Sequence, residues 1–229
     1  YVPSFFYINP INQDAYFGLG ITAPFGLVTE YDDDWVGRYQ AIKSELTTIN
    51  INPAFAWKMG SKLSLGFGFN FQYVDVELSR KIDSGATCFG LANQVDPALA
   101  AQCVASGLAP SQQALDSDVV IEGDDWSYGF NLGMLYEINS DTRTGISYRS
   151  AIEHGLSGDA DFTVNSTLQS FINSLPVPFP LFLSDSTVHA GVELPAQASF
   201  SLAHAINSKV ELLADATWTN WSSFDELRI

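Results

Sequence analysis

Hydrophobic and polar residues alternate with a period of two along most of the chain. Between residues 63 and 73 every odd position is apolar or aromatic, and the even positions carry Ser, Gly, Asn and Gln. The stretch 126–138 follows the same rule, with Trp126, Tyr128 and Phe130 on its apolar side. This period places the two kinds of side chain on opposite faces of a β-strand. A strand of about 11 residues also crosses a bilayer when it is tilted.

Further stretches repeat the alternation, and the connections between them are short and long in turn. Alternating stretches also lie at 49–57 and 188–202 and, less strictly, at 15–25 and 208–221. Short connections lie at 9–14, 59–62, 139–141 and 207–208, and long ones at roughly 26–44, 80–124 and 156–187. An antiparallel meander with short periplasmic turns and long extracellular loops has this plan. We therefore predict an all-β fold, a transmembrane up-and-down β-barrel with short helices in its long loops.

A soluble barrel or sandwich with its apolar face inward is the alternative. Two features count against it. The polar face carries Gly, Ser, Asn and Thr with few Lys or Glu, and the apolar face holds more bulky aromatics than a small barrel interior can contain. Aromatic residues also gather near both strand ends, namely Trp57 and Tyr136 by short turns and Tyr73 and Trp126 by a long loop. Two such girdles are typical of membrane barrels.

The composition narrows the possible partners. The 229 residues carry a net charge of −16, and only 16% of them are charged. A surface this acidic repels phosphate groups, so nucleic acid is excluded as a partner. A hydrophobic fraction of 46% excludes a disordered chain. No run approaches the roughly 18 apolar residues of a membrane-spanning helix.

Two cysteines, Cys88 and Cys103, lie in one polar, loop-like stretch. An even count confined to one loop suggests a disulfide formed in an oxidising compartment, and two free thiols are the alternative. The three histidines, His154, His189 and His204, are far apart, so no metal site is predicted.

The long loops carry helix signals and an apolar run. Asp96 and Pro97 suit the N-cap and first position of a helix that ends before Gly107. Apolar residues at helical spacing follow in the third loop and lead into the run 176–183. We expect the two loops to pack on each other as a cap, and a ligand groove between them is a further hypothesis. Its candidate substrate-binding residues are Leu99, Leu168, Phe171, Ile172, Leu175, Phe179 and Phe182.

The strand near residue 20 ends in Pro24, Phe25, Gly26 and Leu27. Pro24 cannot donate a ladder hydrogen bond, and Gly26 permits a bulge. A kink here would open the wall of the barrel sideways. The alternative is an ordinary strand end punctuated by Pro and Gly.

Charged residues cluster beside the long loops. The acidic runs 32–34 and 123–125 fit a solvated rim better than a weak Ca²⁺ site, because neither has EF-hand spacing. Arg80 and Lys81 are adjacent cations that either meet a substrate carboxylate or pair with Asp75 or Glu77. No catalytic motif or phosphate loop is present in the sequence, so neither an enzyme nor a cofactor is predicted.

The order and spacing of seven strings resemble the FadL/TodX family of outer-membrane transporters for long-chain fatty acids and other hydrophobic compounds. They are Phe25–Tyr31, Leu63–Asn70, Gly123–Asn131, Gly133–Glu137, Thr142–Ser150, Glu193–Ala196 and Trp218–Phe224. The resemblance implies a barrel of roughly 14 strands plugged by an N-terminal hatch. It also implies an entry groove between the longest loops, an inner pocket and a sideways exit at a kinked strand, with passage by diffusion. By that pattern Phe25–Leu27 lies on the kinked strand, and Arg80 faces an anionic head group.

The chain departs from the family pattern at both ends. The hatch is expected upstream of residue 1, and Asn52-Pro53-Ala54 is a coincidence within a strand rather than the hatch motif. The closing strands and the C-terminal aromatic assembly signal of the family are expected beyond residue 229. About eight strands can be counted, so residues 1–229 are interpreted as a partial barrel domain, an internal fragment of a longer exported protein. We expect passive uptake of long-chain fatty acids across the Gram-negative outer membrane, by a monomer surrounded by membrane lipid and lipopolysaccharide. Uptake of small aromatic hydrocarbons is the alternative, and an adhesive surface protein or an outer-membrane enzyme fits less well.

Overall fold

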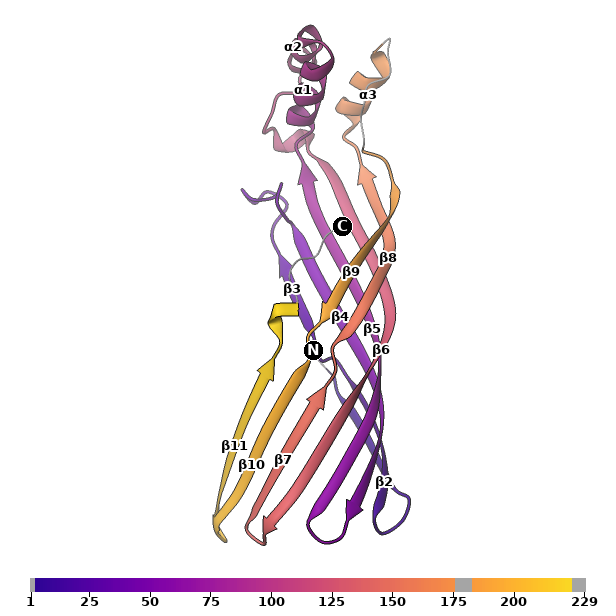
Figure 1. The fold of residues 1–229 in the computed structure, drawn as a ribbon. Helices are drawn as coiled ribbons and strands as arrows, with labels where there is room; N and C mark the ends of the chain where they lie inside the picture. The colour runs from indigo at the N-terminus through magenta and orange to yellow at the C-terminus, as the bar shows by residue number, and fades with distance from the viewer. Residues whose placement is uncertain (1–2, 176–182, 224–229) are drawn as a thin grey trace.

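The computed structural model describes residues 3–175 and 183–223, most of which form one antiparallel sheet (Figure 1). The strands are β1 (Phe5–Pro10), β2 (Ala15–Thr22), β3 (Gly26–Glu30), β4 (Lys43–Met59), β5 (Leu63–Ile82), β6 (Ser117–Asn139), β7 (Thr142–Arg149), β8 (Ile152–Thr163), β9 (Ser186–Leu194), β10 (Gln197–Asn207) and β11 (Val210–Thr219). The helices are α1 (Ser84–Val95), α2 (Pro97–Ala105) and α3 (Ser166–Ser174), with 3-10 turns at Gln113–Leu115 and Trp221–Ser223. Among the described residues, no helix is both long and apolar enough to cross a membrane.

Hydrogen-bonded neighbours follow the order β1-β2-β4-β5-β6-β7-β10-β11, with β3 beside β4 and β8 between β6 and β9. Every strand pair is antiparallel. The tight turns gather at one end of the sheet and the three α-helices at the other (Figure 1). The sheet is open: β1 and β11 end this order, and β3 and β9, each with one described neighbour, are the edge strands nearer the helices. The predicted meander with one plain end and one decorated end is confirmed.

Three long strands form an unbroken panel, and the strands beside them are interrupted. β4, β5 and β6 contain 17, 20 and 23 residues. On one side, β2 and β3 follow each other along the edge of β4. On the other side, β7 and β8 follow each other along β6, and β10 and β9 pair with them in turn. β2 with β3, β7 with β8, and β9 with β10 each follow one line of the sheet. If each of these three pairs is counted as one interrupted strand, the 11 strands become the eight expected from the sequence.

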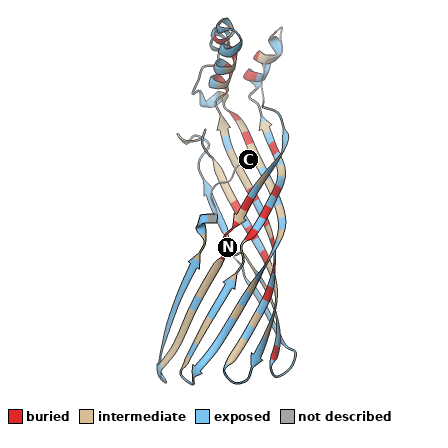
Figure 2. Ribbon diagram, in the orientation of Figure 1, coloured by how far each residue is buried: buried red, intermediate tan, exposed pale blue. Residues whose placement is uncertain are grey.

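The two faces of the sheet differ as the alternation predicts. Phe67, Trp126 and Phe200 are exposed on one face, whereas Asn70 and Gln72 are buried on the other. Large exposed aromatics are typical of a surface that meets lipid. We call that surface the outer face and the opposite one the inner face. Figure 2 shows that buried residues lie along the long strands and within the helices, while β7, β10 and β11 have none.

The strands extend further toward the helices than the sequence predicted. The connections expected at roughly 80–124 and 156–187 are too long, because β5, β6, β8 and β9 continue into them. The connection at 26–44 likewise contains β3. On the outer face of β5 and β6 the aromatic positions give way to acidic ones at Asp75 and Asp124. Beyond this level the apolar side chains of β5, such as Val74 and Val76, lie on the inner face and the polar ones on the outer face. The two faces exchange character there, so the run of outward aromatic positions by which the strand was found in the sequence ends at Tyr73.

Helix α1 was not predicted. It contains Gly85 and Gly90, which are weak helix formers, and its apolar stripe is poor. Its start is marked by Asp83, whose Oδ1 accepts a hydrogen bond from the amide of Ala86 at 2.8 Å. The predicted helix after Asp96 is confirmed as α2, with Pro97 at its first position. The predicted stripe at 168–175 is confirmed as α3.

Candidate ligand-binding site

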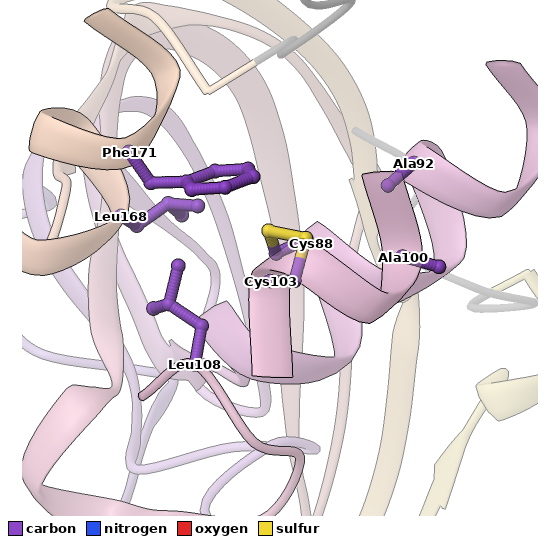
Figure 3. Close-up of a cluster of buried hydrophobic side chains, with 7 residues drawn as sticks. All are labelled: Cys88, Ala92, Ala100, Cys103, Leu108, Leu168 and Phe171. Carbon is purple, nitrogen blue, oxygen red and sulfur yellow. A yellow bond between two sulfur atoms is a disulfide. The ribbon is translucent and has the colours of Figure 1, made fainter. Parts of the chain in front are cut away.

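The helices of the two long loops form one cap. A disulfide between Cys88 and Cys103 joins α1 to α2, with 6.1 Å between their Cα atoms. Across from it, α3 contributes Leu168 and Phe171, and the loop after α2 contributes Leu108 (Figure 3). All five side chains are buried in a single apolar cluster. Loops that are distant in the sequence therefore pack together, as expected.

The predicted groove residues occupy two kinds of position in this cluster. Leu168 and Phe171 lie inside it, so they hold α3 against α1 and α2. Leu99, Ile172 and Leu175 pack against its edge and are partly exposed, so they are the members that a ligand can reach. The last two candidates, Phe179 and Phe182, lie outside the described residues.

A polar clamp ties the loop 31–42 to the base of the cap. Arg38 Nε donates to Asp116 Oδ2 at 2.7 Å, and the Tyr39 hydroxyl donates to Asp116 Oδ1 at 2.9 Å. Tyr39 OH also accepts from Arg38 Nη2 at 2.7 Å. Burial, and then the hydrogen bond to Asp116, raise the pKa of Tyr39 to about 12. The neutral phenol is therefore the form that holds this clamp together.

The two adjacent cations have different surroundings. Lys81 Nζ pairs with Asp118 Oδ1 at 2.5 Å and with Asp33 Oδ2 at 3.1 Å. Arg80 is exposed, and its Nη1 donates to the carbonyl of Tyr39 at 3.4 Å. Arg80 forms no ion pair within residues 3–175 and 183–223, so its charge is available to a carboxylate ligand.

The alternative that these cations pair with neighbouring acids holds for Lys81, but the partners named for it, Asp75 and Glu77, are wrong. Glu77 pairs with Lys43 instead, at 2.6 Å between Nζ and Oε2. In the acidic run 32–34, Asp33 is the partner of Lys81. Across the described part of the chain, no set of three or more His, Cys, Asp and Glu side chains is arranged to hold a metal ion.

The sheet breaks at residues 23–25, which include Pro24 and Phe25. Thr22 pairs with Asn50, and Gly26 pairs with Thr47, so three residues face two across the break. An extra residue in one strand is a bulge, and it bends that strand. The Thr48 hydroxyl accepts from the Phe25 amide at 3.0 Å and donates to the Phe25 carbonyl. One side chain thereby replaces the missing ladder bonds.

An apolar patch on the inner face lies between this break and the cap. It consists of buried Leu46, Val74, Val76, Leu156 and Val192, with Phe25, Leu78 and Ala190 packed against it. Phe25 therefore turns inward rather than toward lipid, and its ring meets Trp221 edge-on with 6.5 Å between centroids. Gly26 and Leu27, the remaining kink candidates, continue as β3.

A polar band crosses the inner face on the other side of the break. Asn52 Nδ2 donates to Asn131 Oδ1 at 2.6 Å and to Asn70 Oδ1 at 3.1 Å. Asn50 Nδ2 also donates to Asn70 Oδ1, at 3.0 Å. Asn50 Oδ1, Asn70 Nδ2 and Gln72 Nε2 are buried without a partner among the described residues. The inner wall thus changes from apolar near the cap to amide-lined further in.

A second interruption lies at the same level on the far side of the panel. β6 pairs with β8 up to Asp124 and with β7 from Asn131, so on this edge its residues 125–130 lack a strand partner, although they still pair with β5 on the other edge. Side chains bridge the gap. Asp125 Oδ2 accepts from the amide of Gly155 at 3.2 Å, and Ser150 Oγ accepts from the amide of Phe130 at 3.0 Å. Thr48 pairs with Val74 and Val74 with Asp125, so both breaks share one row.

Neither the polar band of amide side chains, called the amide band from here on, nor this second break was predicted from the sequence. A signal for the band was present, because inner positions of β4, β5 and β6 carry Asn50, Asn52, Asn70 and Asn131. For the second break the signal was weaker. Pro195 separates β9 from β10, but Ser150 and Ala151 give no comparable mark between β7 and β8.

Comparison with known proteins shows which family and which relatives this chain resembles. A family model described as outer membrane protein transport protein (OMPP1/FadL/TodX) matches residues 1–229. The long-chain fatty acid transport protein of Escherichia coli O6:H1 is 28% identical over 233 residues, which cover 100% of this chain and 50% of that protein. Outer membrane protein P1 of Haemophilus influenzae is 28% identical over 234 residues, which cover 99% of this chain and 47% of that protein.

Solved structures share the fold. A Pseudomonas aeruginosa FadL homologue has a TM-score of 0.76 at 23% identity, covering 99% of this chain and 50% of that one. The Ralstonia pickettii toluene transporter TbuX has a TM-score of 0.66 at 19% identity, covering 96% of this chain and 55% of that one. The chain spans about half the length of the curated relatives it matches. Because the family model covers all of it, the chain belongs to the OMPP1/FadL/TodX family of outer-membrane transport proteins.

Proposed function

We propose that this protein carries long-chain fatty acids passively across the outer membrane. Curated relatives in several organisms bear the name long-chain fatty acid transport protein. The observation in this chain that supports the proposal best is the inner apolar patch around Leu46 and Val192, which lies between the cap and the wall break at Phe25. It offers an alkyl chain apolar surface next to that break.

Entry begins at the cap. The partly exposed Leu99, Ile172 and Leu175 offer an apolar edge where a chain first binds. Phe179 and Phe182, from the apolar run of the same loop, are proposed to add to this edge. Leu168 and Phe171 hold it together from within. The disulfide keeps the α1–α2 side rigid.

Arg80 orients the ligand. It shares the inner face of β5 with Val76 and Leu78, because residues two apart on a strand point the same way. Its guanidinium has a single contact, to a backbone carbonyl at 3.4 Å, among the described residues. An arginine fork binds a carboxylate with two parallel hydrogen bonds. The head group would stay at Arg80 while the tail enters the apolar patch.

Exit is lateral, at Pro24, Phe25, Gly26 and Leu27. The ladder is missing there, and Thr48 alone supplies the replacement bonds. A gap bridged by one side chain needs less free energy to open than a continuous ladder. On one side of the break the outer face carries exposed Ile21, Ile49 and Phe71, which suit lipid. We propose that the protein acts as a monomer within membrane lipid and lipopolysaccharide.

Uptake of small aromatic hydrocarbons by the same route is the second candidate. It is supported by the structural likeness to the toluene transporter TbuX, which at 19% identity concerns the fold. A neutral hydrocarbon needs the apolar patch but no cation. Arg80 therefore favours the carboxylate, and the two candidates differ in their dependence on that residue.

Binding tests the proposal directly. Oleate is titrated into the purified full-length protein in detergent, and bound oleate is measured by equilibrium dialysis, with toluene as a competitor. Saturable oleate binding that toluene displaces weakly is the expected result. Saturable toluene binding without oleate binding would replace the leading candidate with the second.

A further inference from the structure

Arg149 lies on the inner face in the middle of the sheet, without a side-chain partner among the described residues. It ends β7 and shares its face with Gly145 and Ser147, while Ile146 and Tyr148 are exposed on the outer face. It is half-buried and makes no hydrogen bond or ion pair with any residue that the structure describes. The other described arginines differ, because Arg38, Arg80 and Arg143 all have contacts.

Polar residues flank Arg149 in one row across four strands. Asn131 of β6 pairs with Arg149, Arg149 pairs with Gln197 of β10, and Gln197 pairs with Thr219 of β11. Directly paired residues share a face of the sheet, with Cβ atoms roughly 5 Å apart. Asn131 belongs to the amide band through its bond from Asn52. The row therefore offers one cation among neutral hydrogen-bonding groups.

The acidic residues that the structure describes on the inner face are too distant to neutralise this cation. Glu137 lies six residues along β6 from Asn131, roughly 20 Å at the rise of a strand. Asp125 is six residues along β6 from Asn131, roughly 20 Å at the rise of a strand. It is also already bonded to His154 Nδ1 at 3.0 Å. Asp215 is four residues along β11 from Thr219, roughly 13 Å, on a strand that is not adjacent to β7.

Burying a charged group is costly unless it is paired, so a half-buried arginine without a partner among the described residues is a candidate place for an opposite charge to bind. We propose that Arg149, with Gln197 and Thr219 beside it, binds the carboxylate of a long-chain fatty acid on the inner wall. This inference rests on the proposed function and adds a second binding station to it. The guanidinium fork supplies two parallel hydrogen bonds, and the neighbouring amide and hydroxyl complete the shell of the carboxylate.

The second station is separate from Arg80. Arg80 pairs with Val119 of β6, which lies twelve residues along that strand from Asn131. At the rise of a strand this is roughly 40 Å, longer than a stretched oleate chain. One ligand cannot contact both arginines at once. A fatty acid held at Arg149 would lie on the opposite side of the break row from one held at Arg80, because Asn131 and Val119 lie six residues to either side of Asp125 on β6.

Stoichiometry and affinity test this station. Oleate and its neutral analogue oleyl alcohol are titrated into the purified full-length protein and into R149Q, and bound molecules are counted by native mass spectrometry. The control is R143Q, which removes a cation from the same face of the same strand, where Arg143 lies 3.5 Å from Glu211. The wild-type protein and R143Q should bind two oleates. R149Q should bind one, with the second at least about tenfold weaker, and should bind oleyl alcohol as the wild type does.

Two bound oleates of unchanged affinity in R149Q would overturn the second station. If R149Q does not fold, R149K is measured instead; it keeps the charge but lacks the fork, so it should bind the second oleate severalfold more weakly, and unchanged affinity would overturn the inference. A wild-type protein that binds no oleate at all contradicts the proposed function itself. A wild-type protein that binds one oleate, retained in R149Q, contradicts only the station at Arg149.

Discussion

Thr48 bonds both backbone groups of Phe25 with one hydroxyl. The oxygen accepts from the Phe25 amide at 3.0 Å and donates to the Phe25 carbonyl. Thr48 is fully buried, and it stands where the ladder between β2, β3 and β4 is broken. The wall at this point is therefore closed by one side chain, and a change of one residue can weaken it.

Replacing Thr48 by Val should loosen the break. Valine keeps the shape but leaves the amide and carbonyl of Phe25 without their partner, which costs about 1–3 kcal/mol locally. The amide of Phe25 should then exchange its hydrogen faster in a hydrogen–deuterium exchange experiment.

The control is T47V, since Thr47 is exposed and its hydroxyl has only a 3.4 Å contact to Glu45. It should leave exchange at Phe25 unchanged. Equal exchange at Phe25 in T48V and in the wild type would show that the hydroxyl does not hold the break closed.

Replacing Arg80 by Ala should weaken oleate binding about tenfold or more, because a hydrogen bond to a charged group contributes about 1.5–3 kcal/mol. Uptake of toluene, which has no charge, should not change. Uptake of oleate and uptake of toluene are both measured in cells that express the full-length protein at matched levels. A similar loss for oleate and toluene would rule out a role in head-group binding.

Removing the disulfide with C88S and C103S together should destabilise the cap and leave the sheet intact. Closing this loop of 15 residues stabilises it by about 3 kcal/mol in the chain-entropy model. Protease cleavage between α1 and α2 should therefore accelerate, while the heat-dependent shift in gel mobility that reports a folded barrel should persist. Loss of that shift would mean that the cap and the sheet depend on each other for folding.

The clamp at Tyr39 predicts a dependence on alkaline pH. Burial raises the pKa of Tyr39 from its ordinary value of 10.0 to about 12. A raised pKa means that the folded protein favours the neutral phenol, so this contribution is complete below pH 10 and is lost as the pH approaches 12. Protease protection of the loop 31–42 should fall over that window.

The matched variant is Y39F, which lacks the ionisable group. Its loop should start less protected, because the bond to Asp116 is gone. It should also show no further loss between pH 10 and pH 12. A wild-type loop whose protection is flat across this window would contradict the role of the phenol.

The strands, turns and helix start that were predicted correctly from the sequence are those whose residue pattern has a single physical cause. Strands that face lipid on one side and the interior on the other alternate strictly, as 63–73 does, and their tight turns follow from polar residues. The helix start at Asp96 was visible because an N-cap and a proline coincide. The pairing of Cys88 with Cys103 was expected because both lie in one loop.

Other parts depend on neighbours that a sequence does not reveal. In the strand extensions beyond the aromatic level the apolar side chains lie on the inner face instead, as Val74 and Val76 do, so the outward aromatic pattern stops. The partner of Lys81 is Asp118, at the start of β6, rather than a residue near it in the sequence. The position of Arg149 beside Gln197 depends on the register between β7 and β10. Register is set by the whole sheet, so these contacts became visible only in three dimensions.

Uptake of labelled oleate tests the central claim most directly. The full-length gene is expressed in a Gram-negative host that lacks its own fatty-acid transporter, and correct folding in the outer membrane is confirmed by heat-dependent gel mobility. We predict restored, saturable oleate uptake that R80A reduces. A folded protein that restores no oleate uptake, and instead admits labelled toluene, would contradict the assignment to fatty acids.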